Sequence, residues 1–310
     1  MRILFMGTPD FALATLKALY EDGETIVGAV TQPDKPRGRG NIMTPPPVKV
    51  FAESVGIPVF QPTTLKNGAF DETLKALDPQ LIVVVAYGKI LPPSVLNYPR
   101  YGCMNVHGSL LPALRGAAPM QRAIMEGHPV TGITTMYMAD GIDTGDMLLK
   151  AELPILPEDN FESVHDKLAA LGAETMRKTI AALRAGTLTR IPQDDSLATY
   201  AAKIEKNDCL IDFSAPAKAV HDHIRGLSPI PLSFTHTPDG KLLKVVAAHV
   251  GGTQGQKTTP GTVISVSEGI EVACGEGTIV FTRVTPEGKG QMGAADFVRG
   301  RKIAVGDLLK

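Results

Sequence analysis

The chain has 310 residues, of which 44% are hydrophobic and 20% charged, and its formal net charge is -1. This length exceeds the usual size of one hydrophobic core, so we expect two domains, and the composition excludes a wholly disordered protein. The net charge excludes a general nucleic-acid binder with a basic surface. Any nucleic-acid partner would therefore have to meet a local basic patch.

The cysteines and histidines show no pattern of a metal site. Cys103, Cys209 and Cys274 lie far apart and outside any metal-binding motif, which argues against a disulfide framework and against zinc. Six of the seven histidines, all except His107, have no ligand spacing, so we expect no metal. No apolar run reaches the length of about 18 residues that a membrane span needs, and the N-terminus begins as a strand, not as a signal peptide. We therefore expect a cytoplasmic protein.

The first half of the chain alternates strand and helix patterns. Four short apolar runs rich in β-branched residues end at Gly or Pro, as buried parallel strands do. These runs are residues 2–7, 25–32, 58–62 and 81–88. Three more predicted strands (103–107, 132–138 and 147–155) precede a helix predicted over 161–183 with Gly186 as its C-cap. The alternation predicts a Rossmann-like, doubly wound α/β fold with a mostly parallel sheet and helices on both faces.

The pattern changes after Gly186 and predicts a second domain. Residues 187–206 mix Pro, Asp and Thr without periodicity, which is typical of an inter-domain linker. A short helix (about 215–225) and several short strands separated by Gly and Pro follow, and they predict a small β-barrel or sandwich. The predicted strands are residues 232–237, 241–250, 261–267, 269–275 and 277–284. We therefore divide the chain into domain 1–186, linker 187–206 and domain 207–310.

The turn after the first predicted strand reads GTPDF. Dinucleotide-binding folds carry G-x-G-x-x-G at this place, and Pro9 and Phe11 replace glycines that would let the backbone approach a pyrophosphate. We therefore expect no nicotinamide or flavin cofactor, and we interpret Gly7 and Pro9 as a tight turn before a helix.

Residues 34–49 form a strongly basic stretch. It carries Lys35, Arg37, Arg39 and Lys49 against one acid, Asp34, and is too rich in Gly and Pro for a helix. Loops of this length without their own secondary structure are usually functional or disordered. This stretch is the local patch that a nucleic-acid partner would need.

The segment NVHGS (105–109) is polar where a buried strand should be apolar. Period-two geometry puts Asn105, His107 and Ser109 on one face near the carboxyl end of a strand, where open α/β sheets bind ligands. Two interpretations stay open from the pattern alone: a functional site, or a His and an Asn whose polar atoms are satisfied by backbone groups in a turn. A serine hydrolase is disfavoured because G-x-S-x-G is absent.

A second polar segment, ADGIDTGDM (139–147), places three carboxylates among glycines after another predicted strand. Asp140 and Asp146 fit turn-capping roles, and the spacing and the missing closing Glu disfavour a calcium loop. A carboxylate that meets an Asn and a His would fix the imidazole and handle protons. This segment therefore supplies the candidate partner of His107.

Together these motifs resemble those of the folate-dependent formyltransferases. The resemblance rests on N-V-H-G-S-L-L-P-x-x-R-G followed by G-x-D-T-G-D. The motifs G-T-P-D-F, T-Q-P-D-K-P-x-G-R-G and V-V-A-Y-G-x-I-L-P are similar to the branch of the family that formylates initiator methionyl-tRNA for translation initiation. The match is specific over residues 3–190, and beyond it only the arrangement of a linker and a small OB-like barrel agrees.

The resemblance implies a role for each domain. The formyl group of 10-formyltetrahydrofolate would pass to the α-amino group of the charged initiator tRNA in a catalytic domain (1–186). The C-terminal OB-like β-barrel domain (207–310) would bind tRNA, although Ile230 stands where relatives often carry Trp. The family also implies no metal and no membrane partner, and we expect a monomer.

The resemblance also assigns individual residues. The implied catalytic residues are Asn105, His107 and Asp143. The implied folate-binding residues are Ser109, Leu110, Leu111 and Pro112, with the pteridine expected at the backbone of residues 85–91. The implied tRNA contacts are Arg39, Arg37 and Lys35. Arg115 receives no implied role, and we interpret it as a structural arginine that bonds loop carbonyls.

Formyl transfer requires a neutral amine, because only its lone pair can attack the formyl carbon. An α-amine has a pKa of about 7.7 to 8.0, so a modest base such as a His-Asp pair suffices. We expect the Asn105 amide and a His107 N–H to donate to the developing oxyanion, each worth roughly 3 to 4 kcal/mol. Asp143 would orient and charge His107.

Three alternatives remain beside this reading. One is a formyltransferase that acts on glycinamide ribonucleotide or a nucleotide-linked amino sugar, and the second is a formylfolate hydrolase. The basic insertion together with a C-terminal barrel argues against both. The third is a tRNA-binding protein without catalysis, and the intact N-x-H and D-T-G motifs argue against it.

Overall fold

The computed structural model describes residues 1–37, 40–252, 258–300 and 303–310. These residues group into two compact units, which are described separately below. Unit 1 comprises Met1–Gly116, Thr131–Pro154 and His165–Tyr200, and unit 2 comprises Ala117–Val130, Ile155–Val164 and Ala201–Lys310. No helix in the described ranges is long and apolar enough to cross a membrane.

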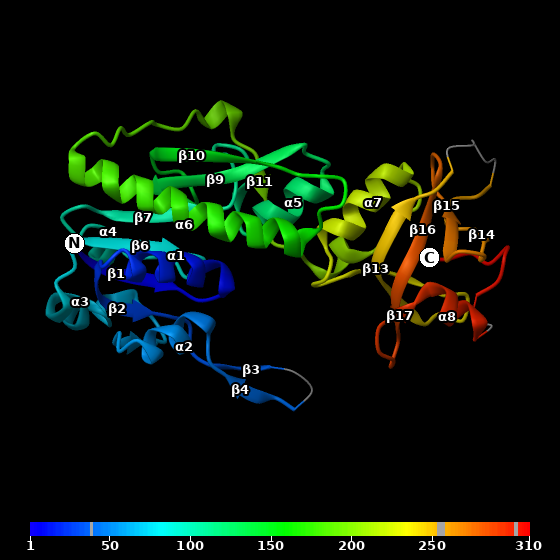
Figure 1. Cartoon of the computed structure of the whole chain (residues 1–310), viewed down its shortest axis with the longest axis horizontal. Helices are drawn as coiled ribbons and strands as arrows, with labels where there is room; N and C mark the ends of the chain where they lie inside the picture. The colour runs from blue at the N-terminus through cyan, green and yellow to red at the C-terminus, as the bar shows by residue number, and fades with distance from the viewer. Residues whose placement is uncertain (38–39, 253–257, 301–302) are drawn as a thin grey trace. The chain divides into compact units, whose positions relative to one another are not determined.

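A seven-stranded sheet forms the centre of unit 1, in the order β10-β9-β7-β6-β1-β2-β5 (Figure 1). Its strands are β1 (Arg2–Gly7), β2 (Thr25–Val30), β5 (Val59–Phe60), β6 (Leu81–Val85), β7 (Cys103–His107), β9 (Val130–Tyr137) and β10 (Met147–Pro154). The pairs β1–β2, β1–β6, β2–β5 and β6–β7 are parallel, whereas β7 and β9 are antiparallel. The predicted Rossmann-like, mostly parallel sheet is confirmed.

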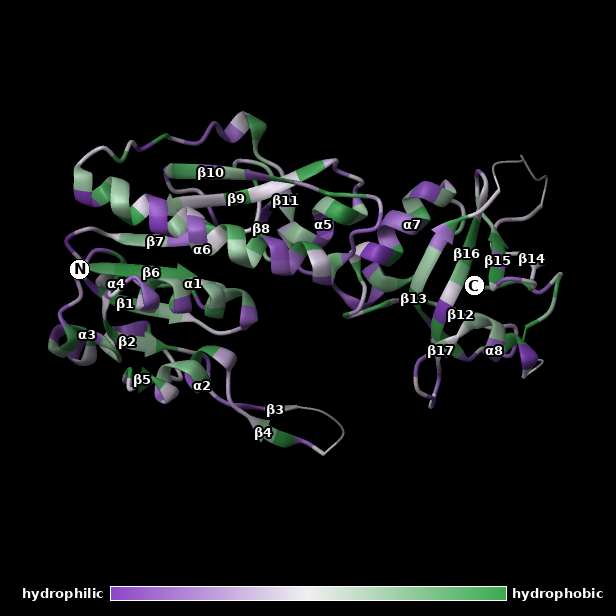
Figure 2. Cartoon of the chain, viewed as in Figure 1, coloured by the Kyte–Doolittle hydropathy of each residue, from purple (hydrophilic) through white to green (hydrophobic). Residues whose placement is uncertain are grey.

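The central strands are apolar because helices cover them. Every residue of β6 is buried, and a strand that is buried on both faces must be apolar throughout. Figure 2 shows β1 and β6 as hydrophobic, whereas hydrophobic and hydrophilic residues alternate along α6. The helices along this part of the chain are α1 (Asp10–Glu21), α2 (Pro47–Ser54), α3 (Asp71–Leu77), α4 (Pro93–Leu96) and α6 (Phe161–Ala185).

Helix α6 packs closely on the sheet and ends as predicted. A Cβ at Gly172 would lie 2.9 Å from the Val106 side chain, so a larger residue there would push α6 away from β7. Gly186 follows the helix with φ = +68°, the left-handed conformation that glycine adopts at a helix C-cap.

The basic stretch is not the unstructured loop that we expected. Its residues form an antiparallel hairpin of β3 (Lys35–Arg37) and β4 (Ile42–Thr44), and α2 begins at Pro47. Asn41 in the turn has φ = +47°, a conformation that Asn tolerates and that tight hairpin turns require. The Gly and Pro residues that exclude a helix are thus compatible with two short paired strands.

Unit 2 contains an antiparallel sheet with the order β12-β13-β16-β15-β14, and β17 pairs with β16. Its strands are β12 (Ser233–His236), β13 (Leu242–Val250), β14 (Val263–Ser265), β15 (Ile270–Ala273), β16 (Thr278–Pro286) and β17 (Met292–Gly293). The helices of this unit are α5 (Pro119–Met125), α7 (Ala217–Gly226) and α8 (Ala294–Arg299). The short segments of the two units are β8 (Arg115–Gly116), β11 (Tyr200–Ala201) and the 3-10 turns Lys66–Gly68, Asp195–Leu197 and Lys206–Cys209.

Residues 307–310 bridge the two edges of the unit 2 sheet. The His236 N–H of β12 donates to the Lys310 carbonyl at 2.7 Å, and the Lys310 N–H donates back at 3.1 Å. On the other edge, the Val263 N–H of β14 donates to the Asp307 carbonyl at 2.8 Å. This short segment therefore closes the sheet into the predicted OB-like barrel, because it satisfies backbone groups that an open edge would leave unpaired.

Candidate active site

Strand β7 carries Asn105 and His107 to the same face of the sheet. It lies between β6 and β9, and alternate residues of a strand point to the same face. His107 is 5% exposed, whereas Asn105 is half-buried. Among the described residues, nothing hydrogen-bonds the Asn105 side chain, so its amide is available to a ligand.

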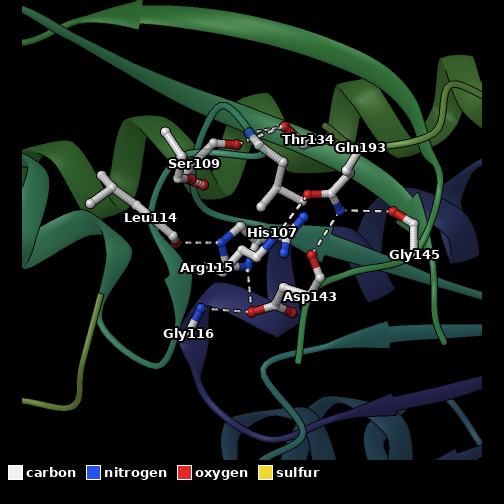
Figure 3. A network of polar contacts seen from close by, with 11 residues as sticks. His107, Ser109, Leu114, Arg115, Gly116, Thr134, Asp143, Gly145 and Gln193 are labelled. Carbon is white, nitrogen blue, oxygen red and sulfur yellow. Dashed lines mark hydrogen bonds and ion pairs between the residues drawn. The ribbon is translucent and has the colours of Figure 1, made fainter. Parts of the chain in front are cut away.

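The two ring nitrogens of His107 have different partners (Figure 3). Nε2 lies 3.0 Å from the Leu114 carbonyl oxygen. Because a carbonyl oxygen only accepts hydrogen bonds, Nε2 carries a proton. Nδ1 lies 3.6 Å from Oδ2 of Asp143, beyond a direct hydrogen bond but within the distance of an ion pair when the imidazole is protonated. Nδ1 is therefore the ring nitrogen that has no direct hydrogen bond among the described residues.

Asp143 lies in the loop between β9 and β10, and the surrounding structure holds it in place. Its φ of +53° is left-handed, which is unfavourable for a residue other than glycine and persists where the surrounding structure fixes it. The Gly116 N–H donates to Oδ2 at 2.9 Å, so one backbone group stabilises the ionised carboxylate. The Asp143 side chain remains 18% exposed and can reach a bound substrate.

Of the three carboxylates in ADGIDTGDM, only Asp143 meets His107 among the described contacts. Asp146 pairs with Arg190, whose Nε lies 2.9 Å from Oδ2. Asp140 is exposed. The structure thus selects one carboxylate where the sequence pattern offered three.

The segment after β7 folds into a tight, internally bonded loop. The Ser109 hydroxyl donates to the Ala113 carbonyl at 2.6 Å, and Thr134 Oγ1 both donates to the Ser109 carbonyl and accepts from the Leu111 N–H. The Leu111–Pro112 peptide bond is cis. Ser109 and Leu111 are buried, whereas Leu110 and Pro112 are half-buried. Any contact of this stretch with a folate would therefore involve Leu110, Pro112 or the backbone.

The loop 85–91 presents unpaired backbone groups at the end of β6. Ala86 and Gly88 have φ of +45° and +80°, and Gln32 Nε2 donates to the Tyr87 carbonyl at 3.0 Å. Gly88 and Ile90 are exposed residues whose backbone groups have no hydrogen-bond partner within the described ranges. Free amides and carbonyls of this kind fit the hydrogen-bonding edge of a pteridine ring.

The expected tRNA contacts are described only in part. Arg39 lies outside the described residues, and of Arg37 only the backbone in β3 is described. Lys35 is exposed, and burial together with the charge of Lys35 lowers the pKa of Lys89. Lys89 donates to the carbonyls of Pro62 and Thr63 at 2.6 and 2.8 Å, whereas Lys49 is neutralised by Asp34 at 2.9 Å.

Four further residues complete the polar network and were not predicted as part of it. Arg115 is 2% exposed and bonds Gln193 and Asp195, so the interpretation that it bonds loop carbonyls is wrong. Thr199 accepts the Leu114 N–H at 2.9 Å with its hydroxyl. Gln193, Asp195 and Thr199 lie in the segment expected as a linker, where no periodicity marks a functional side chain. The only sequence feature that could have indicated a site in this segment is the pair of adjacent acids after Gln193.

Comparison with known proteins points to one family. A formyl transferase family matches residues 1–180, and the C-terminal domain of formyl transferases matches residues 203–302. A methionyl-tRNA formyltransferase of Geotalea uraniireducens (strain Rf4) is 49% identical over 310 residues, which are 100% of this chain and 98% of the relative.

Solved structures share the fold at low identity. The N-formyltransferase of Helicobacter canadensis in complex with folinic acid and dTDP-3-aminofucose has a TM-score of 0.68 and 17% identity, covering 91% of this chain and 98% of that one. HypX from Aquifex aeolicus in complex with tetrahydrofolic acid has a TM-score of 0.64 and 16% identity, covering 96% of this chain and 47% of that one.

Proposed function

The chain belongs to the formyl transferase family, and on this premise we propose that it transfers the formyl group of 10-formyltetrahydrofolate to the α-amino group of initiator methionyl-tRNA. The observation that carries the proposal is the pairing of His107 with Asp143 beside the free amide of Asn105. Relatives named methionyl-tRNA formyltransferase share 45 to 49% identity over the whole chain and favour this substrate.

His107 and Asp143 would handle the protons of the reaction. Nε2 stays bonded to Leu114, so Nδ1 takes up the proton that the attacking amine loses. The carboxylate of Asp143, at 3.6 Å, stabilises the resulting imidazolium. The bond from the amine nitrogen to the formyl carbon forms, the bond from that carbon to the folate nitrogen breaks, and the proton passes to the departing nitrogen.

Asn105 would stabilise charge on the formyl oxygen. Its amide has no partner among the described side chains and backbone groups, so it can donate without first breaking another hydrogen bond. A preorganised donor of this kind contributes roughly 3 to 4 kcal/mol to the transition state. Because Nε2 of His107 is committed to Leu114, a second donor from His107 would have to be Nδ1–H.

The folate would lie between two backbone segments at this edge of the sheet. The backbone of the exposed residues Gly88 and Ile90 suits the pteridine, and the half-buried Leu110 and Pro112 suit an apolar contact. Bound here, 10-formyltetrahydrofolate supplies an activated formyl group, and the chain orients it toward Asn105 and His107. A cytoplasmic location is part of the proposal, and the three free cysteines favour it.

The basic hairpin and the C-terminal domain would bind the tRNA. We assign this role to Arg39, Arg37 and Lys35 of the basic stretch 34–49 and to the OB-like domain (207–310), with catalysis in domain 1–186. Guanidinium groups pair with phosphates as forks or stack on unpaired bases, and the acceptor end of a tRNA offers both.

Two alternatives are less well supported. Sugar N-formyltransferases share the fold with this chain, but at 15 to 17% identity they say nothing of its substrate. A tRNA-binding protein without catalysis would have no use for a carboxylate held in a left-handed conformation beside a histidine.

Formation of formylmethionine tests the proposal. The protein is incubated with 10-formyltetrahydrofolate and methionyl-initiator tRNA, the ester is hydrolysed, and the amino acid is identified. N-formylmethionine is expected, and methionyl-elongator tRNA serves as the control acceptor. Formylation of glycinamide ribonucleotide or an amino-sugar nucleotide in place of the tRNA would support the first alternative, and no transfer to any amine would support the second.

A further inference from the structure

Gln193 joins the loop that carries Asp143 to the loop that follows β7. Its Nε2 donates to two carbonyl oxygens of the first loop, Asp143 at 2.7 Å and Gly145 at 2.8 Å. Its Oε1 accepts from Nε of Arg115 at 3.0 Å. Figure 3 shows these contacts beside His107. Both amide protons and the amide oxygen are thus used in one orientation of the side chain.

Arg115 stands between the residues that hold the two members of the His-Asp pair. The preceding residue, Leu114, accepts the Nε2 proton of His107, and the following residue, Gly116, donates to the Asp143 carboxylate. The guanidinium itself is buried and donates to Gln193 and to Asp195. A shift of Arg115 would therefore move both partners of the site.

The loop of Asp143 needs such support. The left-handed φ of Asp143 is unfavourable in isolation, and Gln193 fixes the carbonyl of that same residue. At Gly145 the loop lies against the end of β9, where a Cβ would overlap the Tyr137 carbonyl. The backbone at Asp143 and just after it is therefore held by close packing and by one side chain from a distant segment.

We propose that Gln193 is a positioning residue, which together with Arg115 holds the Asp143 carboxylate at its working distance from His107. This inference rests on the proposed function, because a fixed distance matters only if the His-Asp pair moves protons. Gln193 acts through Asp143 and does not touch the substrate. A displacement of about 1 Å at a reacting group can lower the rate about 100-fold.

Two substitutions distinguish a role in positioning Asp143 from a role that only supplies a hydrogen-bond acceptor to the buried Arg115. Gln193→Met removes all three hydrogen bonds and keeps the length of the side chain. Gln193→Glu keeps an acceptor for Arg115 and adds an ion pair, but it places oxygen against the two carbonyl oxygens of Asp143 and Gly145. If Gln193 positions Asp143, both variants lower kcat about 10- to 100-fold, with KM for both substrates within about twofold of wild type.

A double variant identifies the residue through which Gln193 acts. In an Asp143→Asn protein, Gln193→Met should lower kcat by no more than about twofold further, since the carboxylate to be positioned is gone. Asp194→Asn is the matched control and should leave kcat unchanged, because within the described ranges the Asp194 side chain hydrogen-bonds only Ser196. Thermal unfolding shows whether each variant is folded.

Hydrogen exchange provides a readout that does not depend on catalysis. Gln193→Met should increase amide exchange in residues 143–146, and Asp194→Asn should not. The inference is overturned if Gln193→Glu keeps wild-type kcat, if the loss is equally large in the Asp143→Asn background, or if exchange of this loop is unchanged. A failure of the proposed function looks different, because wild type then forms no formylmethionine while the exchange result still decides whether Gln193 holds the loop.

Discussion

The Nε2 nitrogen of His107 donates to the Leu114 carbonyl oxygen at 3.0 Å, so the imidazole presents Nδ1 to Asp143. Leu114 has a left-handed φ of +59°, and its N–H is bonded to Thr199. The orientation of the ring is thus set by an acceptor that the fold holds in an unfavourable conformation. In the proposed mechanism, this arrangement leaves Nδ1 as the nitrogen that exchanges protons.

Asp143→Asn should lower kcat at least about 100-fold, because the neutral amide no longer stabilises the imidazolium that forms during proton transfer. Steady-state kinetics with methionyl-initiator tRNA measure the effect. Asp140→Asn is the control, since it removes an exposed carboxylate from the same loop. Near wild-type turnover by the Asp143 variant would remove the His-Asp pair from the mechanism.

Asn105→Ala should lower kcat about 100- to 1000-fold with little change in KM, because the amide acts on charge that develops only in the transition state. The same assay applies, and binding of the folate alone should be unaffected. A large rise in KM with unchanged kcat would instead assign Asn105 to substrate binding.

Arg39→Ala should raise KM for the tRNA and leave KM for the folate unchanged. Loss of a phosphate contact also reduces the slope of log KM against log salt by about one unit per contact. Lys75→Ala is a suitable control, because Lys75 is an exposed lysine that pairs with Glu72. Equal effects on both substrates would contradict a role in tRNA recognition.

Acidification should destabilise unit 2 through two histidines of α7. Burial lowers the pKa of His223 and of His221 below the ordinary value of 6.5, and Nε2 of His223 is buried without a partner in the described structure. The unfolded chain therefore binds these protons more readily than the folded one, so the free energy of unfolding falls as the pH drops below 6.5. For His223, Asp208 and Asp212 oppose the shift, and Arg122 adds to it.

Urea unfolding of the whole protein at several pH values checks this dependence. Replacement of His223 by Gln should make the free energy of unfolding depend less on pH below the ordinary histidine pKa. An unchanged profile would mean that other groups dominate. His128→Gln, which alters a partly exposed histidine paired with Glu126, provides the comparison.

Leu309→Ala should lower the free energy of unfolding by about 2 to 4 kcal/mol, because the side chain is buried in the core of unit 2 and its loss leaves a cavity. Urea unfolding measures the change. Val305→Ala alters a residue that is 61% exposed and lies just before this segment, and it should have little effect. Equal stability of the two variants would show that the closing segment is not part of the cooperative core.

The sequence was most informative where a local pattern determines structure. The apolar run LIVVV predicts β6 because a strand buried on both faces cannot carry polar residues. Asn105 and His107 stand out for the same reason, as polar residues at strand positions. Gly186 marks the end of α6 because only a residue that tolerates positive φ fits there.

The remaining features depend on contacts between distant segments. Gln193 is an ordinary polar residue in an aperiodic stretch, and its hydrogen bonds to Asp143 and Gly145 arise only when that stretch returns to the sheet. Arg115 is equally inconspicuous, since burial of its guanidinium depends on Gln193 and Asp195. The β3–β4 hairpin escaped prediction because each strand has only three residues, too few for a recognisable alternation.

Closure of the barrel by residues 307–310 also orders events during translation. Ribosomes synthesise a chain from its N-terminus, so every strand of the unit 1 sheet has been made once residue 154 is added. By contrast, the outer edges of β12 and β14 have no partner until residues 307–310 are made, after the rest of their domain. Unpaired strand edges invite pairing with other chains. The C-terminal domain is therefore open to such pairing at both edges of its sheet until residues 307–310 join it.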